Sequence, residues 1–142
     1  MDIKEEVLEE IRPACKEIRH AVFVEEQGFV NEFDEQDGTA IHFLISVDGE
    51  PAATARMMTG ERKGEFHVGR VAVRKKFRKH HLGSRIMRLA EREAVRRGGR
   101  VIALSAQCRV QPFYESLGYT ARGEVYLDEY CEHIHMEKQL GQ

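Results

Sequence analysis

The sequence contains few cysteines, no long hydrophobic run and almost no net charge. Its three cysteines are scattered and odd in number, which favours reduced thiols in the cytosol over a disulfide framework. No apolar segment approaches the length of a membrane-spanning helix, and the N-terminus is acidic. We therefore expect neither a membrane span nor a signal peptide, and a cytoplasmic location. The net charge of -2 argues against general nucleic-acid binding.

The composition is typical of one globular domain. The chain has 142 residues, of which 42% are hydrophobic and 32% are charged, and this length suffices for a core without disulfide or metal support. We find no internal repeat, linker or low-complexity segment. The sequence therefore predicts a single domain over residues 1–142.

The spacing of apolar residues predicts strands at 3–8, 40–47, 51–58, 65–73, 101–106, 119–127 and 133–137, and helices at 12–25, 82–97 and 110–117. A further short helix fits within the acidic loop 25–37. The first half of the chain contains hairpins, and the second half has the element order β-α-β-α-β. This order indicates an α/β (α+β) fold, with a mixed, mainly antiparallel sheet and helices on both faces. The strand at 101–106 should lie parallel to the strand at 65–73, through a right-handed crossover.

A basic loop joins the strand at 65–73 to the helix that begins near Leu82. Five of the six residues from Arg74 to Lys79 are basic. Free backbone N–H groups and the positive end of a helix dipole bind anions at such a position. The loop therefore predicts a site for a phosphorylated cofactor at the carboxyl end of the strand. A solvated basic turn is the competing interpretation.

Four motifs, in order along nearly the whole chain, resemble those of the GNAT superfamily of N-acetyltransferases. They are the helix sequence from Ile18 to Gly28, the strand Val71–Val73 with the loop Arg78–Gly83, Gln107 with the later His133, and the run from Phe113 and Tyr114 to Gly118 and Tyr119. The resemblance implies a GNAT fold with acetyl-CoA as co-substrate and no metal. It also implies an amine acceptor, for which we expect a primary amine of a small molecule, and direct attack in a ternary complex. A homodimer is compatible with it, and neither a nucleic acid nor a membrane is expected as a partner.

The resemblance also implies which residues bind the cofactor. The strand would bind the pantetheine arm and the acetyl carbonyl, and the loop would bind the pyrophosphate. The implied residues are Val71, Ala72, Val73, Arg78, Lys79, His80, His81, Leu82, Gly83, Ser84, Gln107, Val110 and Phe113. His81 stands where the family usually has glycine, and three outcomes are open: weaker coenzyme A binding, an imidazole that donates to a phosphate, or a side chain directed outward.

Transfer of an acetyl group to an amine requires a neutral amine and benefits from a proton donor for the departing thiolate. The resemblance places Tyr114 near the thiolate as the general acid; the alternative is a core aromatic residue. His67 precedes Val71 by four residues on the same strand. It is a candidate base because imidazoles titrate near neutral pH, although a hydrogen-bonded strand residue is an equal alternative. Glu26 is a second candidate base, and solvent is a third.

Three other groups of charged or metal-binding residues have interpretations that need no functional site. The acidic segment 25–37 can attract a cationic amine, but a solvated acidic loop is the simpler interpretation. Cys131, His133 and His135 share one strand face but lack a fourth ligand at a characteristic spacing, so strand packing is preferred to a metal site. A helical stripe of arginines is interpreted as a solvated face and consists of Arg85, Arg88, Arg92 and Arg96.

Two other functions compete with this assignment. The first keeps the chemistry but uses another acyl-CoA donor, or a protein N-terminus or lysine as the acceptor. The second is a non-catalytic module that binds and senses acyl-CoA, which the substitution at His81 leaves open. The presence of Tyr114 argues against the second function, because a binding module needs no proton donor.

Overall fold

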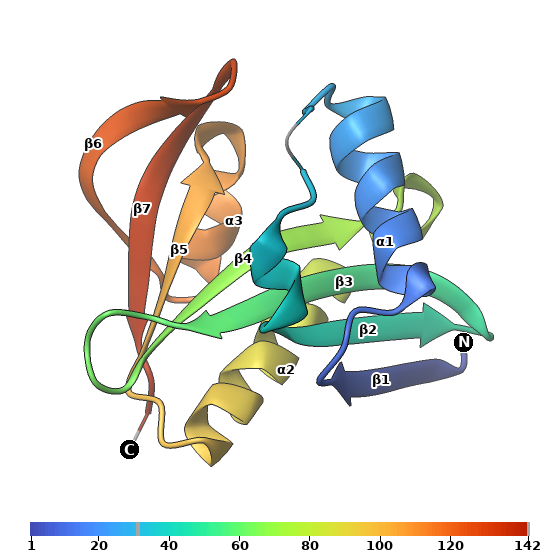
Figure 1. Ribbon diagram of the computed structural model, residues 1–142, viewed down its shortest axis with the longest axis horizontal. Coiled ribbons are helices and arrows are strands. Elements are labelled where there is room, and N and C mark those ends of the chain that lie inside the picture. The colour runs from blue at the N-terminus through green and yellow to red at the C-terminus, as the bar shows by residue number, and fades with distance from the viewer. Residues whose placement is uncertain (31, 142) are drawn as a thin grey trace.

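The computed structural model describes residues 1–30 and 32–141. Within these residues, one sheet has the strand order β1-β2-β3-β4-β5-β7-β6 (Figure 1). The strands are β1 (Ile3–Leu8), β2 (Ile41–Val47), β3 (Glu50–Thr59), β4 (Glu65–Val73), β5 (Val101–Gln107), β6 (Thr120–Asp128) and β7 (Cys131–Gln139). Neighbouring strands are antiparallel except β4 and β5, whose predicted parallel pairing is confirmed.

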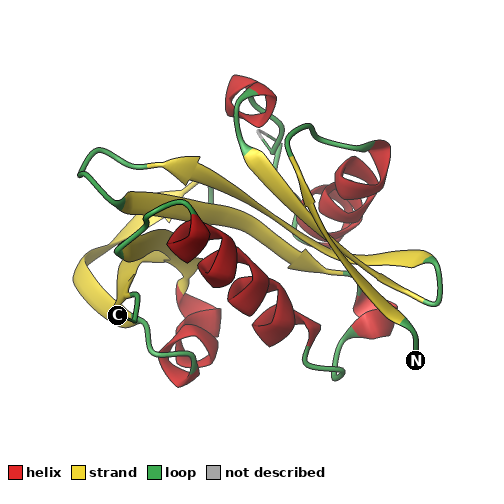
Figure 2. Ribbon diagram, turned by 90° about the horizontal axis from the view of Figure 1, so that it is seen from below, coloured by secondary structure: helices red, strands yellow, loops and turns green. Residues whose placement is uncertain are grey.

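The helices lie on both faces of this sheet. They are α1 (Pro13–Arg19), α2 (Leu82–Arg96) and α3 (Gln111–Ser116), with short 3-10 turns at Glu35–Gly38, Lys75–Phe77 and Cys108–Val110. α1 covers one face, and α2 and α3 cover the other (Figures 1 and 2). The predicted mixed sheet with helices on both faces is confirmed. None of the helices within the described ranges has both the length and the apolar character needed to cross a bilayer.

The N-terminal helix has the predicted extent but not the predicted geometry throughout. α1 begins at Pro13, whose fixed backbone angle suits the first turn, and continues as a π-helical segment over His20–Glu26. The apolar spacing from Cys15 to Val22 correctly predicts a helix, since Cys15, Ile18 and Val22 are buried. Apolar spacing does not distinguish a π-helix from an α-helix over so short a segment.

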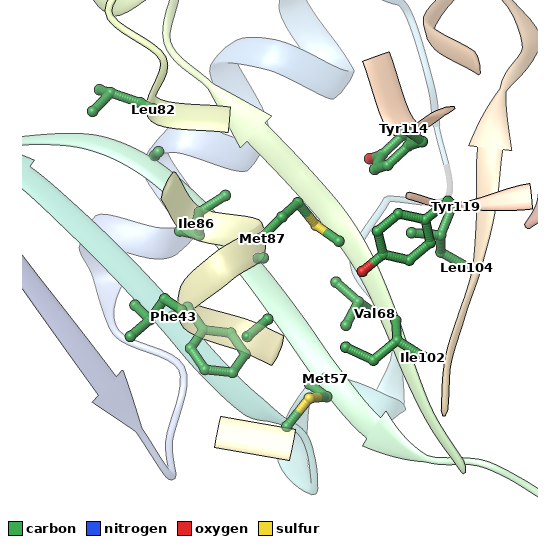
Figure 3. Close-up of a cluster of buried hydrophobic side chains, with 14 of the residues drawn as sticks. Phe43, Met57, Val68, Leu82, Ile86, Met87, Ile102, Leu104, Tyr114 and Tyr119 are labelled. Atoms are coloured by element: carbon green, nitrogen blue, oxygen red, sulfur yellow. The ribbon is translucent and has the colours of Figure 1, made fainter. Parts of the chain in front are cut away.

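The larger hydrophobic core lies between α2 and the sheet. The predicted apolar face of α2 is buried, and its members are Leu82, Ile86, Leu89, Ala90 and Ala94. Figure 3 shows Ile86 and Met87 of α2 beside Phe43 and Val68 of the sheet. A smaller core under α1 includes Ala72 of β4. Strand β4 is therefore packed on both faces, which makes it a rigid platform for a site.

Strands β4 and β5 pair along only part of their length. Their register joins Glu65 to Val101, Phe66 to Ile102 and His67 to Ala103. Beyond this point β4 continues to Val73 and β5 to Gln107 without further pairing between them in the described residues. The two strands therefore form the sides of a wedge, which is visible in Figure 1 between the β4 and β5 arrows.

A β-bulge shapes β4 beside this wedge. Thr54 of β3 pairs with Ala72, whereas Arg56 pairs with Gly69, so two residues of β4 face the single residue Ala55. The first of these two, Arg70, has a φ of 52°, in the left-handed region that L-residues rarely adopt. Such strain persists only where surrounding contacts hold it.

The contacts of the Arg70 side chain supply that support. Its Nε donates to the Glu32 carbonyl oxygen at 2.9 Å, and its Nη2 lies 3.3 Å from Asp34 Oδ2. The bulge is thereby fastened to the segment that follows α1.

A buried ionic network holds the same segment against α1 and β3. Arg19 donates to Glu32 Oε1 and to Asp37 Oδ1, each at 2.7 Å. Arg56 Nη1 donates to Asp34 Oδ1 at 2.7 Å and to Asp37 Oδ1 at 3.0 Å. Only 1% of Arg19 and 4% of Arg56 is exposed, so these charge-assisted hydrogen bonds must offset a large desolvation cost.

The interpretation of 25–37 as a solvated acidic loop is wrong for its second half. Glu32 and Asp37 are buried, and Asp34 is paired with Arg56 and Arg70. The charges of these three acids are matched by arginines, so they leave no excess negative charge to attract an amine.

The network predicts a loss of stability in acid. Burial opposes the ionisation of Asp37, but hydrogen bonds from Arg19 and Arg56 outweigh it and lower the pKa of Asp37 to about 2. Because this value lies below the ordinary 3.8, the carboxylate stabilises the fold at neutral pH by about 2 kcal/mol. That contribution is lost as the pH falls from about 4 to about 2.

Urea unfolding of wild type and Asp37→Asn should therefore differ most at neutral pH and least near pH 2. Glu35→Gln, at an exposed acid of the same turn, is the control, and its effect should change less with pH. A difference between wild type and Asp37→Asn that is independent of pH would contradict this role for Asp37.

Candidate active site

The wedge between β4 and β5 opens into a cleft of about 970 Å³. The cleft brings together residues from β4, the start of α2, the end of β5, α3 and the segment after α1. Of the residues predicted for the site, it is lined by Glu26, His67, Val71, Ala72, Val73, Arg78, Gly83, Gln107, Val110, Phe113 and Tyr114. The edge of β4 that faces β5 has no strand partner after His67 among the described residues, so its backbone groups are available to a ligand.

The other predicted cofactor residues lie outside the lining. Lys79, His80 and His81 are exposed in the turn before α2. Leu82 is 1% exposed and packs in the core, so only its backbone can contribute. Ser84 lies in the first turn of α2.

The turn before α2 has the backbone of a glycine-rich loop without the glycine. His81 has a φ of 59° and Lys79 a φ of 74°, both in the left-handed region. The first hydrogen bond of α2 runs from the Arg85 N–H to the His81 carbonyl oxygen at 3.1 Å. N–H groups in the first turn of α2 therefore remain free for an anion. Because the His81 side chain is exposed and outside the lining, the third alternative, a side chain directed outward, fits best.

Gly83 allows α2 and α3 to approach each other. A Cβ at this position would lie 3.1 Å from Cζ of Phe113, which is tighter than an ordinary contact. A side chain here would therefore push on the Phe113 ring, which lines the cleft. This packing gives a physical reason for glycine at the end of the loop motif.

Residues 26 and 27 span the ends of the two diverging strands. Arg78 donates through Nη1 and Nη2 to both carboxylate oxygens of Glu26, at 2.9 and 2.7 Å, and through Nε to the Val73 carbonyl oxygen at 3.0 Å. Gln107 donates to the Gln27 side chain at 2.8 Å. Both oxygens of Glu26 are engaged by one guanidinium, which suits Glu26 poorly to the role of a base.

Tyr114 belongs to both the core and the cleft. Its ring centroid lies 5.0 Å from that of Phe113 and 5.9 Å from that of Tyr119. Figure 3 shows the neighbouring rings of Tyr114 and Tyr119. Burial raises the pKa of the Tyr114 phenol to about 12, so the hydroxyl keeps its proton at neutral pH. Within residues 1–30 and 32–141 this hydroxyl has no hydrogen-bond partner, and the residue lines the cleft. The two predicted interpretations of Tyr114 are therefore compatible.

His67 lies on the face of the sheet that α1 covers. Its side chain is 41% exposed and lines the cleft, and its Nε2 lies 3.3 Å from Glu65 Oε2. The imidazole is thus within reach of both a carboxylate and a bound molecule. Sequence reasoning identified His67 but not the carboxylate behind it.

The β6–β7 hairpin forms a wall of the cleft that the sequence did not predict. The Tyr126 hydroxyl and Ser105 Oγ are hydrogen-bonded, and the Tyr126 ring stacks on His133 at 6.0 Å. Tyr130 stacks on Phe29 at 5.4 Å, which joins the hairpin to the segment after α1. The contacts of Ser105 with Tyr126 and of Phe29 with Tyr130 join residues far apart in sequence, and no short motif indicates them.

Cys131, His133 and His135 do not converge on a common point. The His133 Nδ1 lies 3.0 Å from the Cys131 carbonyl oxygen, and His135 Nε2 lies 2.8 Å from Glu137 Oε2. In the described part of the chain no three His, Cys, Asp or Glu side chains are grouped as metal ligands. The preferred interpretation, strand packing, accounts for their positions.

Carboxylates pair with most of the arginine stripe of α2. Arg85 and Arg92 bind Glu5 of β1, and Arg96 binds Glu93 within the helix. The stripe lies on the exposed face of α2, whose buried face packs on the sheet.

Comparison with known proteins identifies the family. The family described as acetyltransferase (GNAT) domain matches residues 5–140. A protein of Bacillus subtilis (strain 168), named as an acetyltransferase by inference, is 35% identical over 144 residues, which cover 98% of this chain and 97% of that protein. The crystal structure of Escherichia coli ElaA is similar, with a TM-score of 0.85 and 28% identity over 96% of this chain and 99% of that chain.

A crystal structure from Lactobacillus plantarum, of an N-acetyltransferase likewise named by inference, has a TM-score of 0.89. It is 28% identical and covers 99% of each chain. The family match spans almost the whole chain and includes the wedge, the loop before α2 and Tyr114. This chain belongs to the GNAT family of acetyltransferases.

Proposed function

We propose that the protein transfers an acetyl group from acetyl-CoA to a primary amine of a small molecule, by direct attack in a ternary complex. Membership of the GNAT family supports acyl-CoA-dependent N-acyltransferase activity. The observation that most supports the finer proposal is the cleft itself. It places a buried phenol and a half-exposed imidazole beside an unpaired strand edge and a cationic loop.

Residues at the open end of the wedge suit a phosphorylated cofactor. The N-terminus of α2 offers free N–H groups, and Arg109, which is bonded to no carboxylate in the described residues, adds positive charge at the lining. The free edge of β4 at Val71–Val73 offers backbone groups to the amides of a pantetheine arm. Acetyl-CoA bound there supplies an activated thioester to the amine.

Tyr114 and His67 divide the proton transfers between them. Tyr114 keeps its proton at neutral pH and donates it to the departing thiolate. His67 accepts the proton of the amine, because its imidazole lines the cleft with a carboxylate behind it. Glu26 is the weaker candidate for a base, since Arg78 occupies both its oxygens.

The size of the cleft favours a small acceptor. A volume of about 970 Å³ lies within the range of small-molecule sites, and part of it must hold the pantetheine arm. The non-catalytic alternative loses its main support, because the loop keeps a glycine-like backbone at His81.

Amine-dependent release of coenzyme A, followed with a thiol reagent, tests the proposal against polyamines, amino sugars and amino acids. We expect turnover with at least one of these classes. Binding of acetyl-CoA without release by any amine, including peptide N-termini and lysines, would contradict the proposal and favour the sensing module.

Tyr114→Phe removes the proposed proton donor. We expect kcat to fall about 100-fold, the lower end of the range for general acid catalysis, with acetyl-CoA affinity nearly unchanged. Tyr119→Phe is the matched control, because it alters a neighbouring ring of the same core whose hydroxyl donates to Glu91 at 2.8 Å. Equal turnover in the two variants would remove Tyr114 from the mechanism.

His81 tests the loop geometry. His81→Gly should keep the stability and bind acetyl-CoA at least as well as wild type, because glycine adopts a φ of 59° without strain. His81→Val should lose about 1–2 kcal/mol of stability, since a β-branched residue is disfavoured in this region. Calorimetric unfolding and acetyl-CoA titration measure both effects, and a fully stable, tightly binding His81→Val would show that the backbone at 81 is not left-handed.

A further inference from the structure

Glu65 occupies a site built to hold a carboxylate at the start of β4. Its side chain is 6% exposed. Oε1 accepts the Arg62 backbone N–H at 3.0 Å, and Oε2 accepts from Arg62 Nη2 at 3.2 Å. A Cβ at Gly60 would lie 2.6 Å from Glu65 Cγ, so only glycine leaves room for this side chain. The position of the carboxylate is therefore fixed from several directions.

The fixed carboxylate lies behind the imidazole that faces the cleft. Glu65 Oε2 is 3.3 Å from His67 Nε2. The hydrogen bonds from the Arg62 side chain and backbone lower the pKa of Glu65 to about 2, so Glu65 is charged throughout the neutral range. A carboxylate beside an imidazole stabilises the imidazolium that forms when the ring accepts a proton.

A second imidazole–carboxylate pair lies next to the first and provides a comparison within the same molecule. His135 Nε2 is 2.8 Å from Glu137 Oε2, and the same Arg62 Nη2 lies 3.0 Å from that oxygen. The two rings are 6.5 Å apart. His67 lines the cleft, whereas His135 is outside its lining.

We propose that Glu65 is the positioning residue of the His67 base, and that Arg62 and Gly60 hold Glu65 in place. The inference rests on the role of His67 under the proposed function. The ring nitrogen of His67 that lies away from Glu65 takes a proton from the substrate ammonium, Nε2 stays beside the Glu65 carboxylate, and the neutral amine is left to attack. Glu65 keeps its negative charge throughout, so the step moves one proton from the amine to the imidazole.

The charged groups nearest His67 come from β4, the turn before it, β6 and β7. They are Glu65 on β4, Arg62 in the turn, His135 and Glu137 on β7, and Arg122 of β6, which lies 3.8 Å from Glu137 Oε1. The residues paired with His67 on β3 and β5, Met58 and Ala103, carry no charge. Glu32, Arg56 and Arg70 line the same cleft, and both arginines pair with Asp34 in the buried network. Glu65 is therefore the carboxylate in direct contact with the ring.

Glu65→Gln tests the inference, with Glu137→Gln as the matched control. Each variant removes one of the two carboxylates that share Arg62, and only the first removes the partner of the cleft imidazole. NMR titration follows the two imidazoles separately, and the pH dependence of kcat/KM follows the base. In Glu65→Gln we expect the His67 ring to titrate at lower pH, because the adjacent negative charge is lost.

In Glu65→Gln the acidic limb of the plot of kcat/KM against pH should shift together with the titration of the His67 ring. In Glu137→Gln the acidic limb should stay in place. An unchanged His67 titration, or equal movement of the limb in both variants, would overturn the inference. A third outcome separates the two proposals. If the His67 titration moves but no tested amine supports release of coenzyme A by the wild type, the proposed function fails and the contact between Glu65 and His67 stands.

Arg62→Gln provides a second test that does not depend on folding of Glu65→Gln. Arg62 is 57% exposed, so its replacement disturbs the core little. Because Arg62 Nη2 holds Glu65 Oε2 at 3.2 Å, Arg62→Gln should loosen this carboxylate, and the acidic limb of the kcat/KM profile should move in the same direction as in Glu65→Gln. An acidic limb that stays in place in Arg62→Gln would also overturn the inference.

Discussion

Strands β4 and β5 are parallel neighbours that pair over three residues and then separate, and the site depends on this separation. In a continuous sheet the backbone groups of Val71–Val73 would be bound to the next strand. Here they face a cleft. The packing of β4 on both faces, by α2 on one side and by α1 on the other, keeps it in place without that pairing. A ligand can therefore use the strand edge as its own hydrogen-bonding partner without a cost in refolding the sheet.

The same strand serves both halves of the proposed reaction, and a strained bulge separates them. Arg70, with its left-handed backbone, marks the change. Beyond it Val71 and Val73 line the half that suits the cofactor, and before it His67 lines the half that suits the amine. The bulge is fastened by Glu32 and Asp34, which belong to the buried ionic network with Arg19 and Arg56. The network thus supports the geometry of the cleft as well as the stability of the fold.

Local patterns predicted the parts of the structure that depend on local spacing. The apolar face of α2, the hairpin of β2 and β3, and the parallel placement of β5 all follow from periodicity and turn residues. The histidine at position 81 also indicated a special backbone position, because it stands where the family usually has glycine and glycine is expected where the backbone is left-handed. The buried network was not predictable, since Arg19 and Arg56 find their acids 13 to 22 positions away in sequence. Glu65 was missed for the same reason: its importance arises from Gly60, Arg62 and His67 meeting in space.

The central claim is that the wedge binds acetyl-CoA along β4. Calorimetric titration of the purified protein with acetyl-CoA, repeated with a Gly83→Val variant, tests it most directly. The account predicts one micromolar site in the wild type and much weaker binding in the variant, because a side chain at 83 would crowd the Phe113 ring and occupy the lining of the cleft. Binding of equal strength in the two proteins would place the cofactor elsewhere, and no binding to the wild type would contradict the account of the site.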